Sequence, residues 1–147
     1  MCGIQGIISF TDPFNPEIMT TTLRNMMDKM SKRGPDDQGM ELSEDLRIGF
    51  GFHRLSILDL SPCGHQPMIS PNKHSMLIMN GEIYNFKELR QELEKRGHDF
   101  ISRTDSEILL HALEEWGIAA IPRLNGMFAF AWYDQRQLGQ PHSTAEQ

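Results

Sequence analysis

Hydrophobic residues recur along the chain at spacings typical of strands and helices. Residues 4–10 are apolar and partly β-branched, as in a strand, and Asn15-Pro16 then has the form of a helix cap followed by a first-turn proline. Apolar residues next follow helical spacing until Gly34-Pro35 ends the pattern. This stripe consists of Met19, Leu23, Met26, Met27 and Met30. Methionines at this spacing indicate adaptable core packing rather than a cofactor site.

Two further strands and a helix follow. Residues 48–58 alternate in polarity, which predicts a strand with one buried face. Residues 61–75 are rich in Ser, Pro, Gly and His and are interpreted as a loop, whereas residues 76–79 predict a short buried strand. Asn85 can cap a helix that ends at Gly97.

The last helix and strand precede a change in character. Thr104 and Glu107 fit the capping-box pattern of a helix that stops at Gly117, and residues 127–133 alternate like a strand. Residues 135–147 hold almost nothing apolar and predict a disordered tail. Short, antiparallel-looking strands interleave with helices, so the predicted fold class is α+β.

Composition and charge narrow the classes of function. The 147 residues suit one domain, and the net charge of −6 with a pI near 5.4 argues against nucleic-acid partners and polybasic membrane binding. No apolar run is long enough to span a membrane, and the N-terminus lacks the basic region of a secretory signal. With only two cysteines, we expect a cytoplasmic protein with reduced thiols.

Cys2 is the residue with the clearest catalytic potential. Removal of Met1 would leave a thiol beside a free α-amine, whose pKa is ordinarily about 7.7–8.0 and which can serve as the general base of the thiol. The alternative is an inert, buried cysteine, the usual fate of a lone thiol.

Three other positions have both a functional and a structural interpretation. Asn80-Gly81 can form an oxyanion hole from a side-chain amide and a backbone N–H, or a tight hairpin turn. Arg54, in a predicted strand, suits a bidentate clamp on a carboxylate, or a structural ion pair. Asp105 can bind an ammonium group, or simply begin a helix.

Metal and phosphate sites have little support. Cys63 and His65, with His53 or His74, do not match the spacing of a closed zinc site. The glycines after Arg33 lack the Gly-Lys-Ser/Thr ending of a phosphate-binding loop, so this segment can be a simple turn.

Short motifs extend over roughly residues 1–134 in a fixed order. They are Met1-Cys2-Gly3-Ile4, Arg33-Gly34-Pro35-Asp36, His53-Arg54-Leu55-Ser56-Ile57, Gln66-Pro67-Met68, Asn80-Gly81-Glu82-Ile83-Tyr84-Asn85, Thr104-Asp105-Ser106-Glu107 and Leu124-Asn125-Gly126-Met127-Phe128-Ala129-Phe130-Ala131. In this order they resemble the glutaminase domain of glutamine-hydrolysing asparagine synthetase, a class II (N-terminal nucleophile) glutamine amidotransferase.

This resemblance implies a fold and a set of site residues. The fold would be a four-layer αββα sandwich, with two antiparallel sheets between helices, over residues 2–134. Cys2 would attack the side-chain amide of glutamine to form a thioester, with Asn80 and Gly81 as the oxyanion hole. Arg54 would bind the α-carboxylate of glutamine, and Asp105 its α-ammonium. Further substrate contacts would come from Leu55, Ser56, Ile57, Leu58 and Glu82.

The chain departs from the family after Asp134. Residues 135–147 match neither the remaining strands of the family domain nor its ATP-using synthetase domain. We therefore expect an incomplete domain without cofactor or metal, whose ammonia serves a synthetase domain or subunit that uses ATP and Mg²⁺ to make asparagine from aspartate. A non-catalytic amino-acid-binding module and a truncated inactive product are the alternatives. The exposed docking surface would also allow a homo-oligomer.

Overall fold

The computed structural model describes residues 2–55 and 62–137 as two three-stranded antiparallel sheets with helices on both outer sides. Sheet A has the order β1–β3–β2, from β1 (Gly3–Ile8), β3 (Ile48–Arg54) and β2 (Asp37–Leu42). Sheet B has the order β4–β5–β6, from β4 (Met68–Ile69), β5 (Ser75–Ile83) and β6 (Gly126–Asp134). The predicted α+β class with antiparallel sheets is confirmed.

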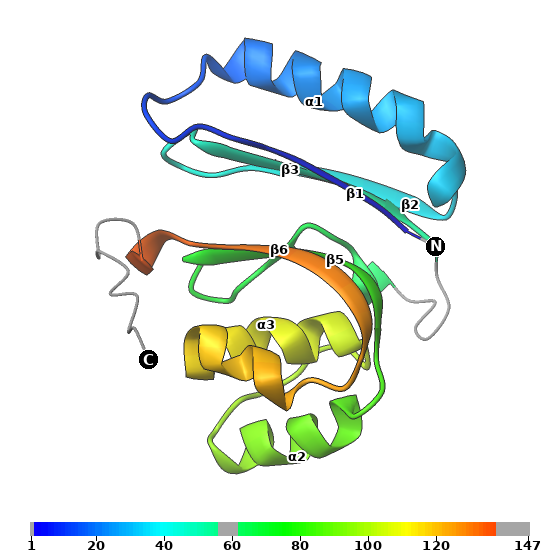
Figure 1. Cartoon of the computed structure of the whole chain (residues 1–147), viewed down its shortest axis with the longest axis vertical. Helices are drawn as coiled ribbons and strands as arrows, with labels where there is room; N and C mark the ends of the chain where they lie inside the picture. The colour runs from blue at the N-terminus through cyan, green and yellow to red at the C-terminus, as the bar shows by residue number, and fades with distance from the viewer. Residues whose placement is uncertain (1, 56–61, 138–147) are drawn as a thin grey trace.

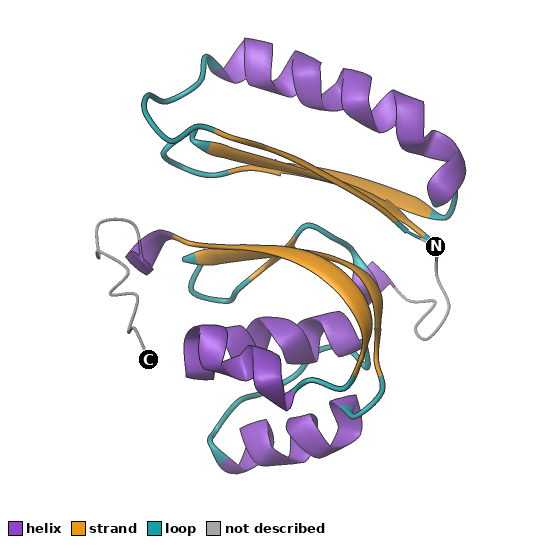
Figure 2. Ribbon diagram, viewed as in Figure 1, coloured by secondary structure: helices purple, strands orange, loops and turns teal. Residues whose placement is uncertain are grey.

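The helices enclose the two sheets (Figure 1). Helix α1 (Pro16–Met30) covers sheet A, and α3 (Asp105–Trp116) packs on sheet B with α2 (Phe86–Lys95) beyond it. Short 3₁₀ turns complete the described chain at η1 (Ser31–Arg33), η2 (Pro62–Gly64), η3 (Gly117–Arg123) and η4 (Gln135–Gln137). Figure 2 shows the resulting sequence of helix, sheet, sheet and helices, which is the layering that the resemblance implies.

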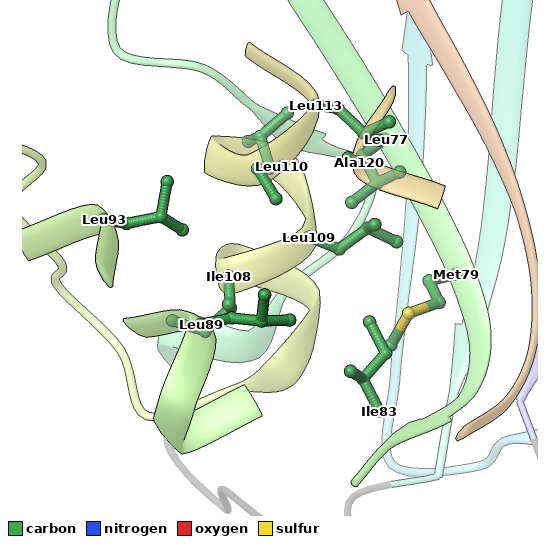
Figure 3. Close-up of a cluster of buried hydrophobic side chains, with 11 residues drawn as sticks. Leu77, Met79, Ile83, Leu89, Leu93, Ile108, Leu109, Leu110, Leu113 and Ala120 are labelled. Atoms are coloured by element: carbon green, nitrogen blue, oxygen red, sulfur yellow. The ribbon is translucent and has the colours of Figure 1, made fainter. Parts of the chain in front are cut away.

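Each sheet buries side chains on both of its faces, and on the outer face of sheet A these include Met19, Leu23 and Met27 of α1. Phe50, Phe52, Met76, Ile78 and Tyr133 pack between the sheets, and Cys2 packs at the edge of this cluster. A larger cluster fills the space between sheet B and helices α2 and α3 (Figure 3). Burial of these side chains is the main force that holds the layers together. It also brings the ends of β3 and β5 to one cavity.

Local signals in the sequence locate most helix ends. Asn15 caps α1 by accepting hydrogen bonds from the N–H groups of Glu17 and Ile18. Gly97 ends α2 with a φ of +94°, and Gly117 ends α3 with a φ of +58°. Among the described residues, no helix is long and apolar enough to cross a membrane.

Some predictions about individual segments are wrong. Residues 37–39, the end of the segment 33–39 interpreted as a possible turn, begin the edge strand β2, and the predicted loop 61–75 contains β4. Asn85 precedes α2 without capping it, because its side chain instead binds the backbone of Arg123 and Asn125. Of the predicted disordered tail, residues 135–137 instead form the short 3₁₀ turn η4, and residues 138–147 lie outside the described residues.

Candidate active site

A cavity of about 500 Å³ opens between the ends of the two sheets and the start of α3. Every predicted site residue that the structure describes lines it, whereas Ser56, Ile57 and Leu58 lie outside the described residues. The cavity thus brings together segments that are far apart in the sequence. Its lining comprises Cys2, Phe52, Arg54, Leu55, Gly64, Gln66, Met79, Asn80, Gly81, Glu82, Tyr84, Thr104, Asp105, Ser106, Met127, Phe128 and Ala129.

Cys2 reaches the cavity from the start of β1. Its neighbour Gly3 pairs with His53 of β3, so the thiol lies beside the segment that follows β3. The Leu55 N–H donates to Cys2 Sγ at 3.4 Å, and Sγ lies 3.7 Å from the Leu55 carbonyl oxygen. The thiol is free, half-buried and at the cavity wall. This location differs from that of a cysteine enclosed in the core.

The Arg33-Gly34-Pro35-Asp36 segment packs against the end of β3. A Cβ on Gly34 would lie 2.5 Å from the Arg54 carbonyl carbon, so only glycine permits this approach. The Asp36 N–H donates to the Arg54 carbonyl oxygen at 3.1 Å. The segment therefore supports the backbone of Arg54 instead of forming an isolated turn.

Arg54 is the last residue of β3, and its side chain is mostly buried. Gly64 lies against the guanidinium, because a Cβ there would collide with Nη2 and would lie 2.7 Å from Cζ. A guanidinium at the wall of a cavity is well suited to bind a carboxylate through two parallel hydrogen bonds. The clamp and the structural ion pair remain alternative predictions for this residue.

Asn80 and Gly81 lie within β5, so the predicted alternative of a hairpin turn is wrong. They pair with Ala129 and Phe128 of β6, and the strand continues to Ile83. The physical reason for the glycine is close approach: φ is +140°, and a Cβ would collide with the Met127 carbonyl oxygen and lie 2.5 Å from the Phe128 Cα. Asn-Gly here brings two strands together beside the cavity.

Asp105 enters the cavity as the first residue of α3. Its Oδ2 accepts a hydrogen bond from the Ile83 N–H at 2.8 Å, which joins the helix to the end of β5. Burial raises the pKa of this carboxyl above its usual value of 3.8, and the nearby charge of Glu82 adds to that effect. Hydrogen bonds from Ile83 and from the first N–H groups of the helix act in the opposite direction. A cationic partner stabilises the ionised form of such a buried carboxyl group.

The cavity lining therefore combines charged groups with a thiol and neutral polar groups. A guanidinium and a carboxylate come from Arg54 and Asp105, while a thiol and amide groups come from Cys2, Asn80 and Gly81. Such a set can hold a molecule that carries both charges at one end and expose the rest of it to the thiol. Within the described residues, no group of three or more His, Cys, Asp or Glu side chains is placed to hold a metal ion.

Gln66 lines the cavity, although the sequence predicted no role for it beyond its place in the motif Gln66-Pro67-Met68. Its side-chain oxygen accepts a hydrogen bond from the Met79 N–H at 2.7 Å. Because β4 pairs with β5 only as far as Met68 and Leu77, this side chain takes the place of a strand partner next to Asn80. The sequence offered one indication of this role. Pro67, which follows Gln66, has no N–H to donate in strand pairing, so a side chain can take over the pairing there.

Comparisons with known proteins agree with this arrangement. A family model described as a glutamine amidotransferase domain matches residues 1–140. Two proteins of Bacillus subtilis (strain 168), asparagine synthetases (glutamine-hydrolyzing) 2 and 3, are each 40% identical to the chain over 137 and 139 residues. Each match covers 93% of the chain but only 18% and 22% of the relative, so the chain spans about a fifth of their length.

A solved structure shares the fold. The glutamine phosphoribosylpyrophosphate amidotransferase of B. subtilis aligns with a TM-score of 0.65 over 90% of this chain and 35% of that one. At 20% sequence identity, this likeness concerns the arrangement of sheets and helices alone.

Proposed function

The chain belongs to the glutamine amidotransferase domain family, and on that basis we propose that it hydrolyses the side-chain amide of glutamine to glutamate and ammonia. The observation that carries the proposal is the cavity. It holds a thiol, an Asn-Gly pair and two opposite charges within about 500 Å³. Free glutamine has a carboxylate and an ammonium at one end and a neutral amide at the other, so it offers a chemical counterpart to each of these groups.

Substrate orientation would come from the two charged residues. Arg54 binds the α-carboxylate of glutamine, and Asp105 binds the α-ammonium. Leu55 and Glu82 add contacts from the cavity wall, and further substrate contacts are predicted for Ser56, Ile57 and Leu58. Because the α-carboxylate and the α-ammonium are bound at the same time, the amide carbonyl faces the thiol in one orientation.

The first chemical step would form a thioester. Cys2 Sγ attacks the amide carbon while its proton passes to the α-amine of the same residue. The negative charge that develops on the carbonyl oxygen is stabilised by the Asn80 side-chain amide and the Gly81 N–H. One such donor typically contributes about 2.7–4 kcal/mol in the transition state. The protonated α-amine then transfers its proton to the departing nitrogen, so the C–N bond breaks and ammonia leaves.

The second step would return the enzyme to its starting state. Water loses a proton to the α-amine and attacks the thioester carbon. The C–S bond breaks, the thiol regains its proton, and glutamate leaves. This sequence consumes one water for each amide and involves no cofactor.

The ammonia would be used by a separate synthetase domain or subunit. The relatives are named asparagine synthetases, and their match to this chain covers only about a fifth of their length. We propose that residues 2–134 act as a glutaminase unit for an ATP-dependent synthetase domain or subunit that converts aspartate to asparagine. ATP and Mg²⁺ would bind to that partner.

An ammonia-release assay with Cys2→Ala tests the proposal. The wild-type chain is expected to release ammonia from glutamine, and Cys2→Ala to release none while still binding glutamine in calorimetry. Mass spectrometry of the N-terminus accompanies the assay, because a retained Met1 would convert the proposed base into an amide nitrogen. Ammonia release by Cys2→Ala at the wild-type rate would refute the mechanism. Binding without turnover by the processed wild-type chain would favour a non-catalytic module.

A further inference from the structure

Glu107 is a buried carboxylate close to the cavity that does not line it. It belongs to the first turn of α3, two residues beyond Asp105, and is only 4% exposed. Its role in the sequence-based prediction was that of a capping-box glutamate, which would accept a hydrogen bond from the Thr104 N–H. The structure differs: the Thr104 N–H donates to Ser102 Oγ instead, at 3.1 Å.

The Glu107 carboxylate holds the turn before α3. Oε1 accepts from the Ile101 N–H at 2.8 Å. Oε2 accepts from the Ser102 N–H at 2.7 Å and from the Ser102 hydroxyl at 2.6 Å. Each carboxylate oxygen therefore accepts a hydrogen bond from a backbone N–H, a group that can only donate, and Oε2 also accepts from a hydroxyl.

The same bonds determine the donors in the rest of the turn. Because the Ser102 hydroxyl proton is directed to Glu107, the Thr104 hydroxyl donates to Ser102 Oγ over their 2.8 Å separation. Thr104 Oγ1 then accepts from the Glu107 N–H at 3.3 Å and so caps the helix. The network closes on itself, and its last member is the residue that directly precedes Asp105.

Asp105 is consequently held from two sides. The Ile83 N–H binds its carboxylate from β5, and the Glu107–Ser102–Thr104 network determines where α3 begins. From these contacts we propose that Glu107 is a positioning residue for recognition of the substrate ammonium, acting through Asp105 without touching substrate. The proposal rests on the glutaminase function proposed above.

The isosteric variant Glu107→Gln isolates this role. A glutamine side chain in the same position replaces one of the two carboxylate oxygens with an NH₂ group, which only donates, so the Ile101 N–H and the Ser102 groups can no longer both face an acceptor. One buried N–H is then opposed by a donor, and the turn must shift. The resulting displacement of Asp105 weakens contact with the ammonium, and a displacement of about 1 Å can cost up to roughly 10²-fold in rate.

The test compares two substrates of the full chain. L-glutamine carries the α-ammonium, whereas 4-carbamoylbutanoate is the same amide without it. For Glu107→Gln we expect kcat/KM on glutamine to fall about tenfold, mainly through KM, while kcat/KM on 4-carbamoylbutanoate stays within about twofold of wild type. The preference for glutamine over the analogue therefore decreases about tenfold.

Two further variants complete the experiment. Ser102→Ala removes the hydroxyl that links Glu107 to Thr104 with less disturbance of folding, and it is expected to shift the preference in the same direction. Glu115→Gln is the control on the same helix, because Glu115 bonds Arg96 and His98 at the surface. It is expected to leave kcat/KM unchanged on both substrates.

The outcomes separate the inference from the proposed function. Equal losses on both substrates in Glu107→Gln and Ser102→Ala would mean that the network supports the fold without selective effect on Asp105, and would overturn the inference. Unchanged preference in both variants would overturn it as well. A wild-type chain with a processed N-terminus and no hydrolysis of glutamine would instead overturn the proposed function, and the inference with it.

Discussion

Gly81→Ala tests whether the close approach of β5 and β6 builds the site. Gly81 has a φ of +140°, and a Cβ would collide with the Met127 carbonyl oxygen and lie 2.5 Å from the Phe128 Cα. Gly97 provides a matched control, since it also has a positive φ, +94°, but nothing lies within 4 Å of its added Cβ. Alanine at Gly97 therefore carries the backbone cost without the collision.

The two costs can be worked out separately. A non-glycine residue with positive φ costs about 1–2 kcal/mol in free energy of unfolding, and this applies to both variants. Overpacking adds about 1–3 kcal/mol at Gly81, because the colliding atoms belong to the backbone of the neighbouring strand. The expected totals are about 1–2 kcal/mol for Gly97→Ala and about 2–5 kcal/mol for Gly81→Ala. At roughly 4 °C per kcal/mol for a chain of this size, the expected decreases in Tm are about 4–8 °C and about 8–20 °C.

Thermal unfolding followed by circular dichroism measures the difference, and ammonia release measures its effect on function. Gly81→Ala should also lose most of its glutaminase activity, because separating the strands moves the Gly81 N–H away from the developing oxyanion. Gly97→Ala should keep its activity, since neither α2 nor Gly97 contributes to the cavity lining. Equal decreases in Tm for the two variants, or a fully active Gly81→Ala, would refute the reasoning.

Three further predictions concern buried polar groups of the cavity. Burial raises the pKa of Asp105 in the folded chain, so its ionisation costs stability above that pKa, and the cost disappears below the unfolded value of 3.8. Asp105→Asn should therefore match or exceed the wild-type Tm at pH 7 while raising the KM for glutamine; a lower Tm or an unchanged KM would contradict this. In the wild type, KM should rise as the pH falls through the raised pKa. Gln66→Met leaves the Met79 N–H without its hydrogen-bond partner. It should lower the free energy of unfolding by about 1–3 kcal/mol in urea denaturation and reduce kcat at saturating glutamine. Unchanged values of both quantities would contradict this prediction.

Elements with strong local signals are the ones that the sequence predicts well. Asn15 caps α1, Thr104 caps α3, and Gly97 and Gly117 end their helices as expected. In each case the determining contacts lie within a few residues, so the local sequence contains the information. Strand β2 was missed because its residues are mostly polar or small and only half-buried, which leaves no alternating pattern.

Other features depended on contacts that are distant in the sequence. Asn80-Gly81 has the composition of a hairpin turn, but pairing with β6 some 50 residues later keeps it extended. Asn85 has the character of a helix cap, yet the backbone around Arg123 and Asn125 competes for its side chain. The capping-box glutamate likewise binds Ile101 and Ser102 in place of Thr104.

The sequence by itself determined which chemical groups the protein has and the order of its described helices and strands apart from β2 and β4. A thiol at position 2, an Asn-Gly pair, an arginine and an aspartate were identifiable from residue type and motif, and so was the resemblance to amidotransferases. Only the tertiary structure decided that these groups face one cavity, and that Gln66 and Glu107 support it. The physical reason is that both decisions depend on hydrogen bonds and steric contacts between distant segments, such as Leu55 with Cys2 and Ile83 with Asp105, which form only when the layers pack.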